Sequence, residues 1–327
     1  MTRTVTFEDP SNLPGAKALK ELGDFCFRKV GGRVLLTNDW GYHATLSEAD
    51  FETFVQGRLP RDGAVWLELK KKGFLRGHRD LKDLAAKFAA HHPYLWKGPS
   101  LHIVVVTLRC NLKCVYCHSS VVGEAQREFD MTLDTARRSV DMIFESPNPS
   151  LMIEFQGGEP MMNWPVVKFV AEYARKKNRT ANRQLKLMMV SNLTLLDEEK
   201  LAACADLGIS ICTSLDGPAS VHDANRIHLG GNSHAATARW LERLVKSGTG
   251  TGALMTTTRK SLSCAKEIVD EYRRLGLGQI FVRPLHYLGF AKKSWHVIGY
   301  EDAEFIAFYR ETLDYAIDLN RGGQAFT

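Results

Sequence analysis

Residues Val106 to Ser120 read VTLRCNLKCVYCHSS and place three cysteines, Cys110, Cys114 and Cys117, close together on one short segment. Thiols at this spacing are compatible with a zinc site, a haem attachment site, a redox disulfide or an iron–sulfur cluster. Each of these sites belongs to a different class of protein. The sequence on either side of the segment therefore has to decide both the fold and the chemistry.

A regular alternation of apolar strands and amphipathic helices follows residue 100 and indicates an α/β fold. The strand candidates are LHIVVVTL from Leu101, LMIEF from Leu151, LKLMMV from Leu185, ISICTS from Ile209, GALMTT from Gly252 and IFVRPL from Ile280. The helices begin near Thr132, Pro165, Asp197, His234, Ser261 and Glu301. Near-continuous apolar strands predict a parallel sheet buried on both faces, as either a doubly wound sheet or most of a (β/α) barrel.

Polar and glycine-rich segments stand where these strands end. The three cysteines follow the first strand and QGGEP (156–160) follows the second, while SNL (191–193), SLDGP (214–218) and RPLHYLG (283–289) follow later ones. Open sheets and barrels both build their ligand sites at this end of parallel strands. The pattern predicts loops that converge on one large ligand.

The first ninety residues have a different texture. Strand-like runs at residues 25–30 and 33–38 flank a Gly-Gly turn, and amphipathic helical stretches follow at residues 46–59 and 64–75. We expect a small winged-helix-like domain over residues 1–90 and a linker over residues 91–100. The α/β core then covers residues 101–327.

Composition describes an ordinary globular protein of 327 residues with 44% hydrophobic residues. The 43 Lys and Arg residues against 37 Asp and Glu give a net charge of +6 without long blocks of one sign, so charge does not call for a nucleic-acid partner. No signal peptide and no run of eighteen apolar residues is present, so we expect a cytoplasmic protein without a membrane partner. The odd total of seven cysteines does not suit a disulfide framework, and we expect Cys26, Cys204, Cys212 and Cys264 to pack in apolar surroundings.

The possible roles of the three cysteines differ in how many thiols they use. Covalent haem would use Cys114, Cys117 and His118 but requires export, and it leaves Cys110 without a role. Structural zinc requires a fourth ligand, usually from a second cysteine pair, and no such pair follows. A thioredoxin-like site also uses only two thiols. A [4Fe-4S] cluster takes all three and leaves one iron open for reaction.

The C-x-x-x-C-x-x-C spacing after the first strand of a chain of six β/α units, with Tyr116 before the last cysteine, resembles the radical S-adenosylmethionine (SAM) superfamily. The resemblance implies a partial (β/α)6 barrel of the radical SAM type, with Cys110, Cys114 and Cys117 as ligands of a [4Fe-4S] cluster. It implies that SAM binds the open iron and is cleaved by one electron to methionine and a 5′-deoxyadenosyl radical, which takes a hydrogen atom from the substrate.

Further segments match the SAM site of this superfamily. GGEP, which comprises Gly157, Gly158, Glu159 and Pro160, resembles the loop that receives the methionine amino group. Glycines allow close approach of a backbone, and a glutamate offsets a positive charge.

Five other residues are assigned by the same resemblance. Ser214 and Asp216 of SLDGP resemble the residues near the ribose and carboxylate of SAM. Arg226 of HDANR resembles the arginine that binds the SAM carboxylate, a task that suits its fork of donors. Asn192 of SNL completes the expected cofactor-binding set together with Tyr116.

A narrower resemblance is to the His-Xaa-Ser system radical SAM maturases, which modify peptides. It is carried by residues 101–120, 153–160, 213–218 and 255–262 and by LLTNDWGYHATLSEADF (35–51). It implies a precursor peptide or protein as substrate, a low-potential electron donor, and an N-terminal module that recognises the precursor by adding it as a strand. No cysteine follows Cys264, so we expect either that the protein works with one cluster or that this chain stops short of a C-terminal extension for auxiliary clusters.

Two alternative functions remain open at this stage. One is oxidation of a Cys or Ser side chain, as in sulfatase maturation. The other is a non-catalytic iron–sulfur binding or sensor protein, although a protein that only holds a cluster would have no use for the SAM-binding segments. The residue that acts as a general base is not identified by the sequence.

Overall fold

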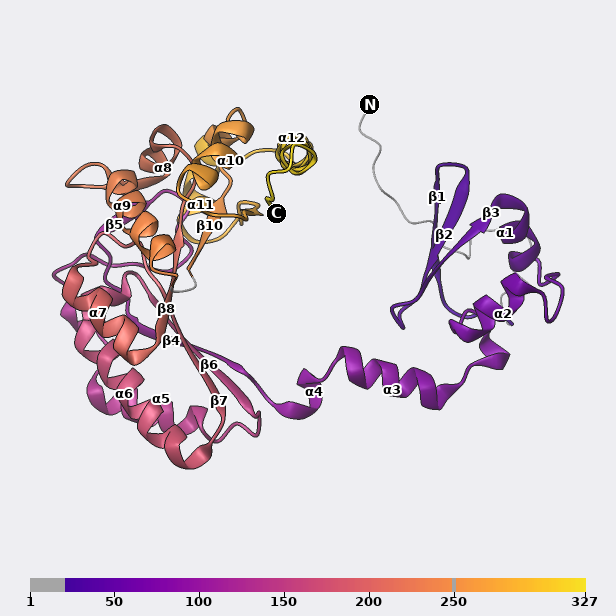
Figure 1. Cartoon of the computed structure of the whole chain (residues 1–327), viewed down its shortest axis with the longest axis horizontal. Coiled ribbons are helices and arrows are strands. Elements are labelled where there is room, and N and C mark those ends of the chain that lie inside the picture. Colours follow the sequence, from indigo (N-terminus) through magenta and orange to yellow (C-terminus); the bar gives the residue numbers. More distant parts are fainter. Residues whose placement is uncertain (1–20, 249–250) are drawn as a thin grey trace. The chain divides into compact units, whose positions relative to one another are not determined.

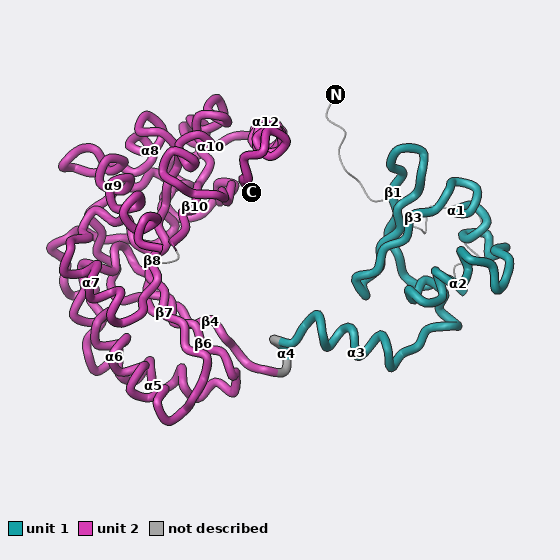
Figure 2. The backbone as a smooth tube through the Cα atoms, in the orientation of Figure 1, with its two compact units in different colours: residues 1–96 teal, residues 97–327 magenta. Residues whose placement is uncertain are grey.

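A computed structural model describes residues 21–248 and 251–327, and the chain divides into two compact units, residues 1–96 and 97–327 (Figure 2). Each unit has its own hydrophobic core.

Unit 1 contains a three-stranded antiparallel sheet in the order β1-β2-β3. The strands are β1 (Cys26–Val30), β2 (Arg33–Thr37) and β3 (His43–Ser47), and the helices are α1 (Glu48–Val55), α2 (Ala64–Lys71), the 3-10 helix η3 (Arg76–His78), α3 (Leu81–His91) and α4 (Tyr94–Lys97). Gly31 and Gly32 join β1 to β2 with φ angles of 57° and 75°, a conformation that glycine adopts without strain. The sheet packs on α1 and α2 through side chains such as Leu36, Phe54 and Leu69.

In unit 1, β1, β2, α1 and α2 match predicted elements, whereas β3 and α3 were not predicted. Its proposed linker over residues 91–100 includes the short helix α4. A winged-helix relation for this unit stays a prediction.

Six strands of unit 2 form a parallel sheet in the order β11-β10-β8-β7-β6-β4 (Figure 1). They are β4 (Leu101–Thr107), β6 (Ser150–Gly157), β7 (Gln184–Val190), β8 (Ile209–Ser214), β10 (Gly252–Thr256) and β11 (Phe281–Arg283). Each strand pairs with the next of the six along the chain, and within the described residues the end strands β4 and β11 do not pair with each other. The predicted α/β class and the open, partial (β/α)6 barrel are confirmed.

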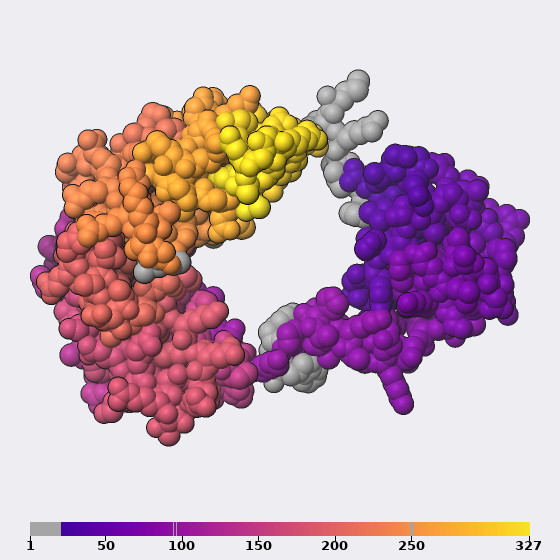
Figure 3. All heavy atoms as spheres, viewed as in Figure 1, coloured from indigo at the N-terminus to yellow at the C-terminus, as the bar shows by residue number. Residues whose placement is uncertain are grey.

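Helices cover one face of this sheet, and Figure 1 shows α5, α6 and α7 side by side along it. The helices of unit 2 are α5 (Leu133–Ile143), α6 (Trp164–Ala181), α7 (Glu198–Leu207), α8 (Ala219–Asn225), α9 (Ser233–Lys246), α10 (Ala265–Arg274), α11 (Gly289–Ile298) and α12 (Asp302–Arg321), with 3-10 turns η4 (Arg127–Phe129), η5 (Pro160–Asn163) and η6 (Arg259–Ser261). Thr132 and Asp197 cap the first turns of α5 and α7 through side-chain oxygens, which satisfies otherwise free N–H groups. Figure 3 shows the atoms of α12, in yellow, at the surface of unit 2.

Burial alternates along the strands. In β6, Ile153 and Phe155 are buried against α6 residues such as Val167, whereas Glu154 and Gln156 on the other face are only partly buried. Burying each large apolar side chain contributes about 1.5–3 kcal/mol to folding. The expectation of strands buried on both faces is therefore wrong, because the barrel is open and alternate residues face a cavity. Among the described residues, no helix is both long and apolar enough to cross a membrane.

Candidate functional site

The three cysteines lie on the segment between β4 and the start of the first covering helix. A short strand, β5 (Leu112–Cys114), pairs antiparallel with β9 (Arg226–His228), so that Cys114 lies opposite Arg226. The amide of Cys110 donates to the carbonyl of Val122 (3.2 Å), and the amide of Val115 donates to the carbonyl of Asn225 (2.9 Å). Backbone hydrogen bonds therefore fix the segment before any ligand binds.

Arg109, next to the first cysteine, fastens this segment to its surroundings. Its guanidinium donates to both carboxylate oxygens of Asp130 (2.8 and 2.7 Å) and to the carbonyls of Glu124 (2.9 Å) and Met162 (2.7 Å). The residue is buried, so these charge-assisted bonds replace the water that it loses. Sequence reasoning missed Arg109, because nothing in the local pattern separates it from a surface arginine.

Cys110, Cys114 and Cys117 line one cavity of about 370 Å³. Burial raises the pKa of Cys110 to about 12, and it also raises the pKa values of Cys114 and Cys117. Thiolates in this place would therefore need added positive charge, which the irons of a cluster supply. Among the described residues, no three Cys, His, Asp or Glu side chains are arranged to hold a single metal ion. A [4Fe-4S] cluster takes one thiolate per iron, so its ligands surround the cluster instead of converging on one ion.

Gly157 and Gly158 stand at the end of β6 against the cysteine segment. A Cβ atom on Gly157 would lie 2.1 Å from the carbonyl oxygen of Thr107, and one on Gly158 would lie 2.2 Å from that of Arg109. The amide of Gly158 donates to the Thr107 carbonyl (3.0 Å), and that of Glu159 donates to the Arg109 carbonyl (2.8 Å). The glycines are therefore required by contact with the chain's own backbone, whatever they do for a ligand.

Glu159 is fully buried, and its carboxylate binds other parts of the chain. Oε1 accepts from the Ser191 hydroxyl (2.8 Å) and the Met161 amide (3.1 Å), and Oε2 accepts from the Asn192 amide (2.8 Å). Burial raises the pKa of Glu159, and these hydrogen bonds oppose the rise. Glu159 joins the GGEP and SNL segments from behind the cavity wall, and Pro160 next to it begins η5.

Tyr116, Asp216 and Arg226 form a network that the sequence did not predict as a unit. The hydroxyl of Tyr116 donates to Oδ2 of Asp216 (2.6 Å) and accepts from Nη1 of Arg226 (2.8 Å). Asp216 also accepts from the Thr256 amide (3.2 Å) and the Asn225 side chain (3.3 Å).

Asp216 and Arg226 each favour the charged form of the other. Burial raises the pKa of Asp216, with the guanidinium of Arg226 acting against the rise. Burial alone would lower the pKa of Arg226, but attraction to Cys114, Tyr116 and Asp216 holds it well above its usual value. Arg226 is therefore a permanent positive charge at the wall of the cysteine cavity.

The predicted site residues fall into two groups. The cavity is lined by Cys110, Cys114, Tyr116, Cys117, Gly157, Gly158, Asn192, Ser214 and Arg226. Glu159, Pro160 and Asp216 are buried next to these residues and hold them in place. The side chain of Asn192 donates to Asn111 (3.0 Å), and Ser214 ends β8.

The other four cysteines do not share one environment. Cys204 is buried in the core as expected, but Cys26 is exposed, so the packing prediction is wrong there. Cys212 is only partly buried and lines the cavity from β8. A period-two strand carries alternate residues to opposite faces, which explains its position on the inner face.

Residues 104–272, just over half of the chain, match the family described as the Radical SAM superfamily. The chain is 27% identical to the Fe-coproporphyrin III synthase of Methanosarcina barkeri over 67% of this chain and 51% of that protein. It is 30% identical to a cysteine-type anaerobic sulfatase-maturating enzyme of Clostridium perfringens over 39% of this chain and 35% of that protein. The chain spans about half of the length of the curated relatives that it matches.

Two solved structures share the fold. Native anSMEcpe with bound AdoMet matches 69% of this chain and 62% of its own, with a TM-score of 0.60 and 20% identity. SuiB of Streptococcus suis, bound to its precursor peptide SuiA, matches 92% of this chain and 70% of its own, with a TM-score of 0.54 and 14% identity. At these identities the likeness is one of fold.

Proposed function

Because the chain belongs to the radical SAM superfamily, we propose that it uses a [4Fe-4S] cluster and SAM to modify a ribosomally made peptide or protein. The observation that carries this proposal is the convergence of Cys110, Cys114, Cys117 and the buried Arg226 on one cavity. Three thiols and a fixed cation suit a cluster with one open iron and an anionic ligand beside it.

The cysteine side of the cavity would hold the cofactors. Cys110, Cys114 and Cys117 would supply thiolates to three irons. When bound and reduced, the cluster and SAM supply a 5′-deoxyadenosyl radical that removes a hydrogen atom from the substrate.

The residues around this cluster position would orient SAM. Arg226, held by the Tyr116 hydroxyl, which in turn donates to Asp216, would donate to the SAM carboxylate. Asn192 and Ser214 line the same cavity as polar contacts for the nucleoside. Glu159 would offset the positive charge of the methionine amino group from behind the glycines.

Support for a peptide substrate comes from the two-unit organisation. Residues 1–90 would recognise the precursor, residues 91–100 would act as a linker, and residues 101–327 would carry the chemistry. A separate anchor raises the effective concentration of a flexible target at the active site. SuiB, whose fold matches nearly the whole chain, was solved with its precursor peptide. We propose that the substrate carries His-Xaa-Ser repeats, and that a cytoplasmic low-potential protein donates the electron.

Oxidation of a Cys or Ser side chain is a second candidate, supported by the identity to the sulfatase-maturating enzyme. The two reactions differ in their products. Anaerobic incubation of reconstituted protein with SAM, dithionite and either a His-Xaa-Ser repeat protein or a sulfatase-derived Cys peptide, followed by mass spectrometry, separates them.

We expect a mass change on the repeat protein that depends on SAM and reductant. A change only on the Cys peptide would favour the second candidate. SAM cleavage with neither substrate modified would reject both substrate proposals and leave the cofactor chemistry standing. Absence of SAM cleavage with a cluster present would instead indicate a non-catalytic iron–sulfur protein.

A further inference from the structure

The wall of the cavity opposite the cysteines is the inner face of the sheet. It is built from alternate residues of β6, β7, β8, β10 and β11, all at the carboxyl ends of these strands. Two ionised groups belong to this wall, Glu154 from β6 and Arg283 from β11. Neither residue is required by the cofactor-binding set described above.

These two charges lack strong partners within the described part of the chain. The side chain of Arg283 makes no hydrogen bond or ion pair there, and Glu154 accepts only from the side chain of Gln156 on its own strand. Arg226, across the cavity, is instead bound to Tyr116 and balanced by Asp216. A charge left unpaired in a cavity loses water when a ligand enters, so a fitting ligand has to supply the missing partner.

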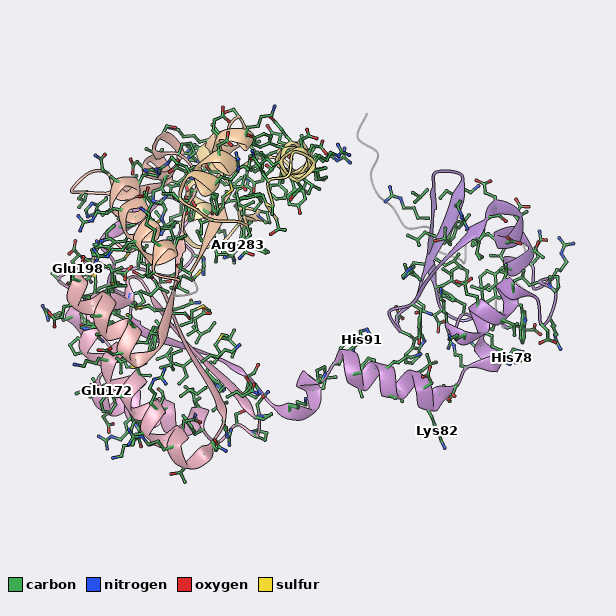
Figure 4. The ribbon with its side chains drawn as sticks, in the orientation of Figure 1. His78, Lys82, His91, Glu172, Glu198 and Arg283 are labelled. Atoms are coloured by element: carbon green, nitrogen blue, oxygen red, sulfur yellow. The ribbon has the colours of Figure 1, made fainter. Side chains whose placement is uncertain are left out.

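The thiol of Cys212 is affected electrostatically by both Glu154 and Arg283. Burial raises the pKa of its thiol, Glu154 raises it further, and Arg283 lowers it. The thiol therefore lies within the field of both groups. Arg283 lies at the end of β11, and Figure 4 labels it on unit 2.

An apolar strip continues from this wall onto β4. The register pairs Ile103 with Glu154 and Val105 with Gln156, so the side chains of these pairs share the inner face. Ile103 is 53% exposed and Val105 is 43% exposed, which is high for apolar residues in the middle of a strand. Exposed apolar surface next to a polar cavity is typical of a binding surface. Ile103 and Val105 lie beside two residues that line the cavity, Glu154 and Gln156, so an extended peptide in the cavity could also contact the strip.

We propose that Glu154, Arg283 and the β4 strip of Ile103 and Val105 form the substrate subsite and bind an extended segment of the precursor peptide. Glu154 accepts a hydrogen bond from a donor side chain of that segment, such as imidazole or ammonium. Arg283 donates to a main-chain carbonyl or a carboxylate of the same segment, and the strip contacts a neighbouring apolar side chain. This inference rests on the proposed peptide substrate and names the residues that select it.

SAM is the competing ligand for these charges, because its methionine part also carries an amino group and a carboxylate. The two ligands predict different variant behaviour. If the wall binds peptide, removing either charge leaves SAM affinity unchanged and weakens only the peptide reaction. If the wall binds SAM, both variants lose SAM affinity.

The test uses the reconstituted full chain with Glu154→Gln, Arg283→Gln and Arg283→Lys. Glu172→Gln on α6, labelled in Figure 4, and Arg310→Gln on α12 are matched controls, because both residues are exposed and neither is part of the cavity wall. SAM affinity is measured by calorimetry. Peptide turnover is measured by mass spectrometry with a synthetic peptide of three His-Ala-Ser repeats and with a version that has Ala in place of His.

We expect SAM affinity within about twofold of wild type in every variant, and KM for the His peptide raised about tenfold or more in Glu154→Gln and Arg283→Gln, as for lost hydrogen bonds to charged groups. Arg283→Lys should recover part of the loss, because it restores the charge without the fork. Glu154→Gln should have no further effect on the Ala peptide.

Unchanged peptide turnover in both charge-removing variants would overturn the subsite, as would a parallel loss of SAM affinity. These outcomes differ from failure of the proposed function. In that case the wild-type protein itself cleaves SAM but modifies neither peptide, and the subsite falls with the proposal.

Discussion

Arg226 and Arg283 line the same cavity, but their side chains differ in burial and in hydrogen bonding. Arg226 is buried and bound to the Tyr116 hydroxyl, whereas Arg283 is partly exposed and makes no side-chain bond within the described residues. On the cysteine side of the cavity, the protein therefore supplies hydrogen-bond partners for its own charged groups. A site fixed in this way suits a cofactor that is used in every turnover. On the sheet side, the charge of Arg283 has no partner within the described residues, which suits a substrate that binds and dissociates in each turnover.

The sharpest test of this difference is stability after loss of each charge. Arg226→Ala leaves Asp216 buried without its counter-charge, so we expect a loss of about 3 kcal/mol or more in unfolding free energy. Arg283→Ala removes a partly exposed, unpaired group and should change stability by about 0.5 kcal/mol or less. Urea unfolding of the reduced apoprotein measures both. Equal losses of unfolding free energy in the two variants would show that the cysteine side and the sheet side of the cavity do not differ in this way.

Gly158→Ala tests the backbone contact that fixes the cysteine side. The new methyl group would lie 2.2 Å from the Arg109 carbonyl oxygen, so the segments must move apart. We expect a loss of about 2–3 kcal/mol, as for an overpacked site, together with a lower iron content after reconstitution. Gly252→Ala is the matched control, because a Cβ on that strand glycine meets nothing within 4 Å. Iron content equal to wild type in Gly158→Ala would show that the contact is not needed for the cluster.

His222 supplies a pH test of the same buried region. Its Nδ1 accepts from the Asp216 amide (3.3 Å), and burial, followed by repulsion from Arg226 and His234, lowers its pKa to about 2. In the unfolded chain His222 takes up a proton near pH 6.5, whereas in the folded chain it stays neutral. Its contribution to the unfolding free energy is therefore fully present above that pH and is lost as the pH falls below it. The loss attributable to His222 is about 1.4 kcal/mol per pH unit as the pH falls toward 5.

Comparison with His222→Asn isolates this effect. Asparagine keeps an acceptor near the Asp216 amide but does not titrate, so its stability should depend less steeply on pH. Urea unfolding of both proteins between pH 7 and 5 gives the two slopes. Equal slopes would show that His222 does not stay neutral in the fold.

A small effect is also expected from a change at Cys212 on the sheet side. Cys212→Ala removes a partly buried thiol that, among the described residues, makes one weak hydrogen bond, to the Thr213 carbonyl at 3.8 Å. We expect less than about 1 kcal/mol of destabilisation, since no large cavity forms. Iron and sulfide content should equal that of wild type. Loss of the cluster in this variant would assign Cys212 to the metal site. The sheet side of the cavity would then also take part in cluster binding, contrary to our expectation.

The sequence predicted the six strands and the helices α5, α6, α7, α9, α10 and α12, because hydrophobic periodicity carries that information directly, but it did not predict α8 or α11. LMIEF at Leu151 became β6, and the predicted helix near Asp197 begins at Glu198. The alternation of burial was missed, because Met152 and Met188 read as core residues while facing the cavity side of an open sheet.

The roles of individual site residues were harder to predict, since they depend on contacts between distant segments. Tyr116 and Asp216 are one hundred positions apart and bond at 2.6 Å. Arg109 and Met162, joined at 2.7 Å, give no local signal. Glu154 and Arg283 were not singled out because a charged residue in a strand also occurs on solvent faces.

The most direct test of the central claim is 5′-deoxyadenosine formation by anaerobically reconstituted protein with SAM and dithionite. We expect 5′-deoxyadenosine from the wild-type protein and from Arg283→Gln, and none above background from the variant in which Cys110, Cys114 and Cys117 are all alanine. Equal product from the triple variant, or no product from wild-type protein that holds its full complement of iron and sulfide, would contradict it.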